Sequence, residues 1–238
     1  MMAEAKATPS PAHVARNAAA ILEGALLAFV AGFVDTCGFI ALFGLFTAHV
    51  TGNFVLIGAA LADYHGGLIA KLLALPVFVI VVAIVRAMSL MLEDRRKNAA
   101  VPLLGFQILF LAGFLACGVL AGPMHDGDAP LVVLTGMLAV TAMAIQNAAS
   151  RTVFTMHTPT TVMTGNVTQV IIDLVDLSFG RANAECRLRV RKMVPAILAF
   201  TVGAASGALG YIFTGFWCIA APIAILLVIF GREMGRKV

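Results

Sequence analysis

The 238-residue sequence is 61% hydrophobic and 12% charged, with a formal net charge of +4 and a mean hydropathy of +1.00. Soluble domains are about 45–50% apolar and about 25% charged, so this composition excludes a soluble globular protein and indicates one membrane domain. The basic residues lie at the ends of apolar runs, so we expect the lipid bilayer, and no nucleic acid, as partner.

Six apolar stretches are long enough to cross a bilayer, which takes about 20 residues for a helix. Two shorter apolar segments follow the first and the fourth of these stretches. We predict an all-α polytopic membrane protein, with a polar tail at 1–17, full helices at about 18–47, 72–92, 101–120, 131–155, 194–213 and 216–230, and short helices at about 53–61 and 166–177. Gly203, Gly207 and Gly210 recur at helical spacing and predict close packing against another helix.

Charges between the apolar stretches predict the orientation. Lys and Arg gather at 95–97, 181–192 and 232–237, whereas the loop at 125–128 holds His and Asp only. The positive-inside rule places the basic segments and both termini in the cytoplasm. The short segments then have no crossing of their own, which predicts two short re-entrant or broken helices at membrane depth.

An internal repeat relates the two halves of the chain, 18–121 and 131–238. The segment "HVTGNFVLIG" (49–58) resembles "VMTGNVTQVI" (162–171), at an offset of 113 residues between Thr51 and Thr164. Each half makes an odd number of net crossings, so the two repeats are expected to have inverted topology. Inverted repeats are a frequent construction in transporters, with the site at the midplane between them.

Each repeat carries one Thr-Gly-Asn turn, formed by Thr51, Gly52, Asn53, Thr164, Gly165 and Asn166. Glycine permits a sharp turn or a close approach, and the Thr and Asn oxygens can cap a helix start. A short helix that starts inside the membrane aims unpaired N–H groups at the bilayer centre, so two facing starts would form a polar constriction that favours anions. Ordinary caps at the membrane surface fit these side chains equally well.

Ionisable residues inside spanning helices are rare and tend to face the interior. Glu23 and Arg86 lie toward the ends of predicted helices, where we expect contacts with the interface, and two other residues are candidates for the interior. They are Asp35 in the first helix and Arg151 in the fourth, and the repeat aligns Arg151 about one turn from Asp35. We therefore predict an Asp35–Arg151 pair. It either holds the two halves together or takes part in transport.

Four more polar residues are candidates for a solute pathway. Gln146 and Asn147 lie in the fourth predicted helix, and His49 and His157 flank the two turns. Histidine can exchange a proton near neutral pH. A histidine in a membrane protein is nevertheless more often a hydrogen-bonded packing residue.

A family resemblance rests on the segment around the first turn. The stretch "AGFVDTCGFIALFGLFTAHVTGNFVLIGAALA" (31–62) resembles the opening signature of the YoaK-like family of bacterial inner-membrane proteins. In that family, a Gly-aromatic/aliphatic-Val-Asp stretch precedes (T/S)GN, and "MTGNVTQ" in the second half also fits. The resemblance covers most of the chain. It implies a multi-pass protein of the bacterial inner membrane and leaves the biochemical activity open.

The expected function is a channel or transporter for a small solute, with anions among the candidates and the site between the two turns. The alternative is a membrane scaffold or sensor that transports nothing. No HExxH, GxSxG, paired-Asp protease or nucleotide-loop pattern is present, so we expect no enzyme. The four scattered cysteines indicate neither a disulfide nor a metal site, and no cofactor is expected. The sequence is compatible with a homo-oligomer.

Overall fold

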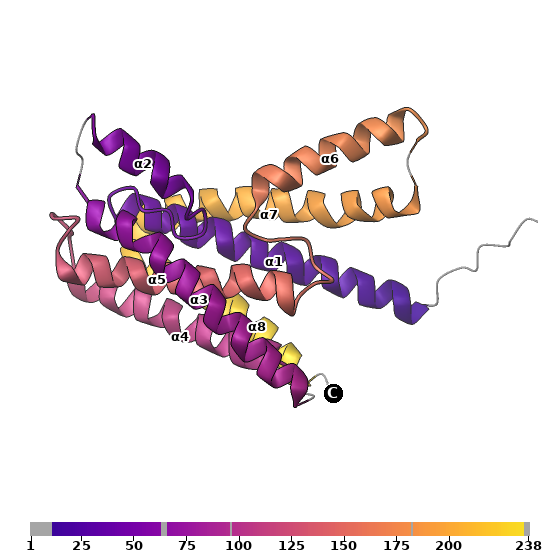
Figure 1. Cartoon of the computed structure of the whole chain (residues 1–238), viewed down its shortest axis with the longest axis horizontal. Helices are drawn as coiled ribbons and strands as arrows, with labels where there is room; N and C mark the ends of the chain where they lie inside the picture. Colours follow the sequence, from indigo (N-terminus) through magenta and orange to yellow (C-terminus); the bar gives the residue numbers. More distant parts are fainter. Residues whose placement is uncertain (1–10, 63–65, 96, 182, 236–238) are drawn as a thin grey trace, which may run out of the picture.

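The computed structural model describes residues 11–62, 66–95, 97–181 and 183–235, and its regular elements over these ranges are all helical. The elements are α1 (Pro11–Ala41), α2 (Gly52–Ala60), α3 (Leu68–Asp94), α4 (Ala100–Ala121), α5 (Pro130–Thr152), α6 (Met163–Ser178), α7 (Ala184–Thr214), the 3-10 helix η1 (Gly215–Ile219) and α8 (Ala220–Gly235). Each predicted apolar segment overlaps one α-helix, and the two short segments correspond to α2 and α6 (Figure 1). Some predicted bounds are wrong, because α1 ends at Ala41 rather than at Thr47 and α7 begins at Ala184 rather than at Val194.

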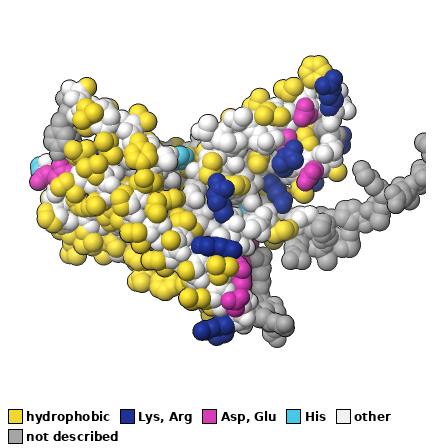
Figure 2. All heavy atoms as spheres, viewed as in Figure 1, with side chains coloured by type: hydrophobic (Ala, Val, Ile, Leu, Met, Phe, Trp, Pro, Cys, Tyr) yellow, Lys and Arg dark blue, Asp and Glu magenta, His cyan; other side chains and the backbone are white. Residues whose placement is uncertain are grey.

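Five stretches within the described ranges are long and apolar enough to cross a membrane. They are Asn17–Ala41, Leu68–Asp94, Ala100–Ala121, Pro130–Thr152 and Ala184–Gly235, the last of which contains α7, η1 and α8. Figure 2 shows hydrophobic side chains over much of one face of the bundle, with most Lys and Arg side chains toward the end where the chain terminates. The molecule is therefore an all-helical polytopic bundle. The count of six full helices and two re-entrant ones stays a prediction.

Helix α1 crosses the middle of the bundle and meets α7 with almost no side chain between them. A Cβ added at Gly203 or Gly207 would overlap the carbonyl oxygen of Phe29 or Phe33, and one added at Gly32 would overlap that of Phe200. Small residues allow such contact between helix backbones in membranes. The close packing predicted from the glycine spacing of α7 is confirmed.

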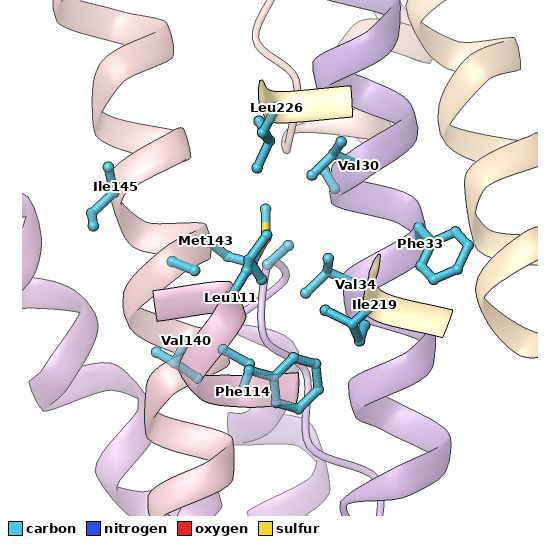
Figure 3. Close-up of a cluster of buried hydrophobic side chains, with 14 of the residues drawn as sticks. Val30, Phe33, Val34, Leu111, Phe114, Val140, Met143, Ile145, Ile219 and Leu226 are labelled. Carbon is cyan, nitrogen blue, oxygen red and sulfur yellow. The ribbon is translucent and has the colours of Figure 1, made fainter. Parts of the chain in front are cut away.

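A buried apolar cluster joins α1 to the helices on its other side. Figure 3 shows the side chains that meet there, which include Val30, Val34, Leu111, Phe114, Val140, Met143, Ile219 and Leu226. They come from α1, α4, α5, η1 and α8. The short helices stand apart from this core, because α2 packs mainly on α3 and α6 mainly on α7.

An ion pair holds α6 against the beginning of α7. The buried Asp173 carboxylate accepts hydrogen bonds from Arg189 Nε at 3.0 Å and from its terminal nitrogen at 2.7 Å, and from Gln169 Nε2 at 3.0 Å. The Arg189 guanidinium is the main cause that lowers the pKa of Asp173 from 3.8 to about 2. This pair fixes the direction in which α6 leaves the bundle.

Substitution of Gly207 by Ala tests the contact between α1 and α7. The added methyl group would press against the backbone of Phe33, and overpacking of this kind costs about 1–3 kcal/mol of unfolding free energy. Gly231→Ala in α8 is the matched control, because its added Cβ has no atom within 4 Å. Unfolding in detergent micelles should show destabilisation for Gly207→Ala only. Equal stability of the two variants would contradict the close contact.

Candidate functional site

The first Thr-Gly-Asn turn ends a loop that folds back along α1. The first loop, residues 42–51, begins where Phe43 and Gly44 take positive φ angles of 54° and 81° and end the helical path. The Thr47 and Ala48 amides then donate to Asp35 Oδ1 at 2.8 and 2.7 Å. Asp35 precedes the end of α1 by six residues, about 9 Å along the axis. The loop therefore returns toward the middle of the bundle before α2 starts.

Asn53 and Gly52 close the first loop through Phe46. Asn53 Nδ2 donates to the Phe46 carbonyl and Asn53 Oδ1 accepts from the Phe46 amide, both at 2.9 Å. A Cβ at Gly52 would lie 2.8 Å from the Phe46 ring, so only glycine fits beside it. Thr51 precedes α2 without a side-chain capping bond. The prediction that Thr51 and Asn53 cap the helix is wrong, because Asn53 is bound to the loop instead.

The second loop, residues 153–162, folds back along α5 in the same manner. Asn166 Nδ2 donates to the Pro159 carbonyl at 2.7 Å, and both asparagines bind the residue seven positions earlier. Pro159 has no amide hydrogen, so this half forms one bond where the first half forms two. The Thr160 and Thr161 hydroxyls accept from Gln146 Nε2 and Asn147 Nδ2 at 3.0 and 2.6 Å.

The prediction that side chains of the second turn cap the helix is also wrong. Thr164 lies within α6, whose capping residue is Val162 and has no side-chain capping bond. A Cβ at Gly165 would lie 3.5 Å from Val162, an ordinary contact, so this glycine is not required for space. The two turns are thus alike in their asparagine and different in their glycine.

A pocket of about 350 Å³ lies between the two turns. Figure 1 shows α2 and α6 diverging from the middle of the molecule toward its opposite ends, and the pocket is lined by the residues where they begin. Its lining comes from both loops, α3, α5 and α6, and comprises Ala48, His49, Val50, Thr51, Leu75, Phe78, Asn147, Thr161, Val162, Met163 and Thr164. Hydroxyl, imidazole and amide groups from both halves therefore meet at one place.

The first-turn amides of α2 do not point unpaired into this pocket. The amides of Gly52, Asn53 and Phe54 donate to the carbonyls of His49, Val50 and Thr51 at 2.8, 3.1 and 3.2 Å. The prediction of an anion-binding helix start is therefore wrong for α2. The anion that the loop amides do hold is the carboxylate of Asp35.

The predicted Asp35–Arg151 pair does not form in the described structure. Asp35 is buried and is bound by its own loop, and His49 Nδ1 lies 2.7 Å from Asp35 Oδ2. Arg151 is exposed in the last turn of α5. The repeat alignment compares positions along the chain, and it does not say which way a side chain faces on its helix.

Gln146 lies in the core, whereas its neighbour Asn147 lies at the pocket. Gln146 Nε2 donates to the Leu27 carbonyl at 2.7 Å, and Gln146 Oε1 accepts from Gln107 Nε2 at 2.7 Å, so Gln146 joins α1, α4 and α5 in the core. Asn147 lines the pocket. Gln146 is 2% exposed and is not part of the pocket lining.

His157 forms a second carboxylate–histidine pair that the sequence did not indicate. Its Nε2 lies 3.4 Å from Glu23 Oε2, and the two side chains are 5% and 2% exposed. His157 Nδ1 is buried and has no hydrogen-bond partner within the described residues. Glu23 was expected near a helix end, but α1 starts at Pro11 rather than near residue 18, which moves Glu23 into the protein. Across the described residues, no three His, Cys, Asp or Glu side chains cluster as metal ligands.

The chain is similar to known proteins over most of its length. A family model described as a protein of unknown function (DUF1275) matches residues 24–231, which include both turns and all residues of the pocket. The UPF0700 transmembrane protein YoaK of Bacillus subtilis (strain 168) is 27% identical over 214 residues, or 89% of this chain and 92% of that protein. No solved structure matches the chain.

Alanine at the two asparagines should give graded losses of stability. Asn53→Ala leaves two backbone groups of Phe46 unpaired and Asn166→Ala leaves one carbonyl, and each unpaired buried group costs about 1–3 kcal/mol. Thermal unfolding in micelles should rank Asn53→Ala below Asn166→Ala. Thr51→Val, which removes no hydrogen bond of the loop, is the control. Equal losses in both alanine variants would contradict the account of the turns.

Proposed function

The chain belongs to the DUF1275 family, and on this premise we propose that it is a channel or transporter for a small solute. The proposed protein sits in the bacterial inner membrane with both termini in the cytoplasm. It crosses the bilayer with six helices, and the segments that end in α2 and α6 re-enter from opposite sides. The proposed pathway passes between the two Thr-Gly-Asn turns.

The pocket between the turns carries this proposal. Irregular backbone within a bilayer is tolerated only where protein or a water-filled cavity covers it. The two loops meet this condition with internal hydrogen bonds, and His49, Thr51 and Thr164 remain at the pocket surface. Transporters commonly place their site at the ends of broken helices between two repeats. A dry apolar seam at this position would instead have favoured a scaffold.

The inverted repeat is supported by the equivalent hydrogen bonds of the two loops. Phe46 with Asn53 and Pro159 with Asn166 are related by the same offset of 113 residues that relates the turns. The loops follow α1 and α5, and Figure 1 shows α2 and α6 leading to opposite ends of the molecule. If the two loops open in turn, each would act as a gate that gives access to the pocket from one side of the membrane.

The pocket presents a few polar groups among mostly apolar side chains, which suits a small solute without a full negative charge. A volume of about 350 Å³ lies at the lower end of the range for ligand pockets, about 300–1,000 Å³. Hydroxyls and amides can bind a neutral polar group. An anion would receive little from the first loop, because its amides already bind Asp35 or carbonyls of the turn.

Flux through liposomes tests the proposal. The purified protein should speed the entry of at least one solute in a panel of urea, glycerol, formate and nitrate, followed by light scattering. Thr51→Val with Thr164→Val should slow this flux about tenfold or more, since each lost hydroxyl removes about 1 kcal/mol of hydrogen bonding.

Thr201→Val provides the control, because Thr201 is exposed on α7 and bonds to its own helix. Its flux should equal that of the unaltered protein. Equal flux in the double variant would remove the turns from the pathway. Flux no faster than that of empty liposomes for every solute would favour the scaffold or sensor.

A further inference from the structure

Helix α1 supplies one carboxylate to each of the two loops. Asp35 binds His49 of the first loop, and Glu23 binds His157 of the second. The two acidic residues are 12 positions apart, which is about 18 Å along the helix. One helix therefore contacts a histidine of each loop, of which His49 lines the pocket and His157 is buried outside its lining.

We propose that the two carboxylate–histidine pairs bind protons and thereby control the loops, so that the transport is coupled to protons. This inference rests on the proposed function and adds its coupling ion. In it, His49 responds to the proton concentration on the first loop's side and His157 to that on the second loop's side.

The first pair has a defined site for the proton. Asp35 Oδ2 lies 2.7 Å from His49 Nδ1, which assigns the Nδ1 hydrogen to this bond and leaves Nε2 to take up or release a proton. The His49 side chain is 34% exposed and lines the pocket, so water can reach it. In the proposal, a proton moves from water in the pocket to Nε2. The hydrogen bond then becomes an ion pair, which holds the loop more tightly.

The second pair is longer and more buried than the first, with a separation of 3.4 Å and a His157 side chain that is 5% exposed, and it uses the other ring nitrogen. His157 Nε2 faces Glu23, and Nδ1 is the buried nitrogen without a partner in the described ranges. An unpaired buried polar atom is unusual and calls for a functional or structural reason. A proton taken up at Nδ1 turns His157 into an imidazolium ion beside the Glu23 carboxylate.

The charged surroundings of the pairs are sparse. Around His49, the pocket presents Leu75, Phe78, Asn147 and Thr164 from α3, α5 and α6, and Phe200 of α7 lies against the ring. Asp35 is thus the charged group at His49 among the described residues.

Around His157, the ring of Phe154 is stacked at 5.4 Å, and Lys192 of α7 donates from Nζ to the Met156 carbonyl at 2.9 Å. Lys192 is the cation beside this loop, and Glu23 is the anion.

Neutral side chains hold part of the second loop, because the amides of Gln146 and Asn147 bind Thr160 and Thr161. In the first loop, Asp35 already binds the backbone amides of Thr47 and Ala48. The imidazoles of His49 and His157 are therefore additional to these contacts. Ionisable side chains in the membrane interior are costly and are kept mainly for function.

Cysteine accessibility at different pH values tests the inference. The background protein has Cys37, Cys117, Cys186 and Cys218 replaced by Ala, and Thr51→Cys or Thr164→Cys is added. Proteoliposomes are treated with a membrane-impermeant thiol reagent from either side. Labelling of the exposed Ser178→Cys serves as the control, which corrects for the pH dependence of the thiol reaction itself.

Relative to Ser178→Cys, labelling of Thr51→Cys should fall about tenfold from about pH 8 to about pH 5.5, the range in which histidine titrates. His49→Gln can still donate to Asp35 and does not titrate, so it should abolish this pH dependence and leave that of Thr164→Cys intact. His157→Gln should abolish the pH dependence of labelling at Thr164→Cys and leave that at Thr51→Cys intact.

The outcomes separate the two proposals. Labelling at both positions with the same pH dependence as Ser178→Cys would overturn the coupling and keep the pathway. A pH dependence of Thr51→Cys that survives in His49→Gln would also overturn it. No labelling at either position at any pH, with normal labelling of Ser178→Cys, would overturn the proposed function itself.

Discussion

The structure depends on one constraint, which is that backbone groups away from water must find partners within the protein. Helices satisfy it by themselves, whereas the two loops cannot. In the first loop, Asp35 and Asn53 bind the amides of Thr47 and Ala48 and both backbone groups of Phe46. In the second, Asn166 and Lys192 bind the carbonyls of Pro159 and Met156. The main structural role of the Thr-Gly-Asn turns is therefore to let the chain reverse direction inside the bundle.

Helix α1 connects this constraint to the rest of the fold. On one side its backbone touches α7 at glycines, which prevents the two helices from separating or sliding freely. On its other sides it meets the apolar core of Figure 3 and the loops that its carboxylates bind. Because α1 is held so firmly, movement is expected in α2, α6 and the loops. These parts have fewer neighbours in the bundle and enclose the pocket.

The two halves hold their loops with different chemistry. Backbone amides of the first loop bind the Asp35 carboxylate, whereas threonine hydroxyls of the second loop bind the amides of Gln146 and Asn147. An added Cβ would press on a neighbouring ring at Gly52 and would make an ordinary contact at Gly165. The pocket between the two halves is consequently asymmetric, with His49 on one side and Asn147 on the other.

The sequence by itself determined the all-helical membrane class, and it predicts an internal repeat. Apolar length, basic segments and the duplicated turn predict eight helices and the place of the pocket, because hydropathy and turn residues are local properties. The helix boundaries failed where tertiary contacts decide them: α1 was expected to run to Thr47, but this residue is bound back to Asp35. The predicted pair of Asp35 with Arg151 was also wrong, because tertiary contacts bind Asp35 to its own loop.

Only the tertiary structure decided the partners of the buried polar groups. Asp35 with His49, Glu23 with His157, and Gln146 with Gln107 are separated by 14 to 134 residues or lie on faces that a linear repeat does not define. Which groups meet depends on helix rotation and on close packing at glycines, and neither can be read from hydropathy. The turns could thus be found from the sequence, whereas the charged pairs that hold them had to be found in the folded chain.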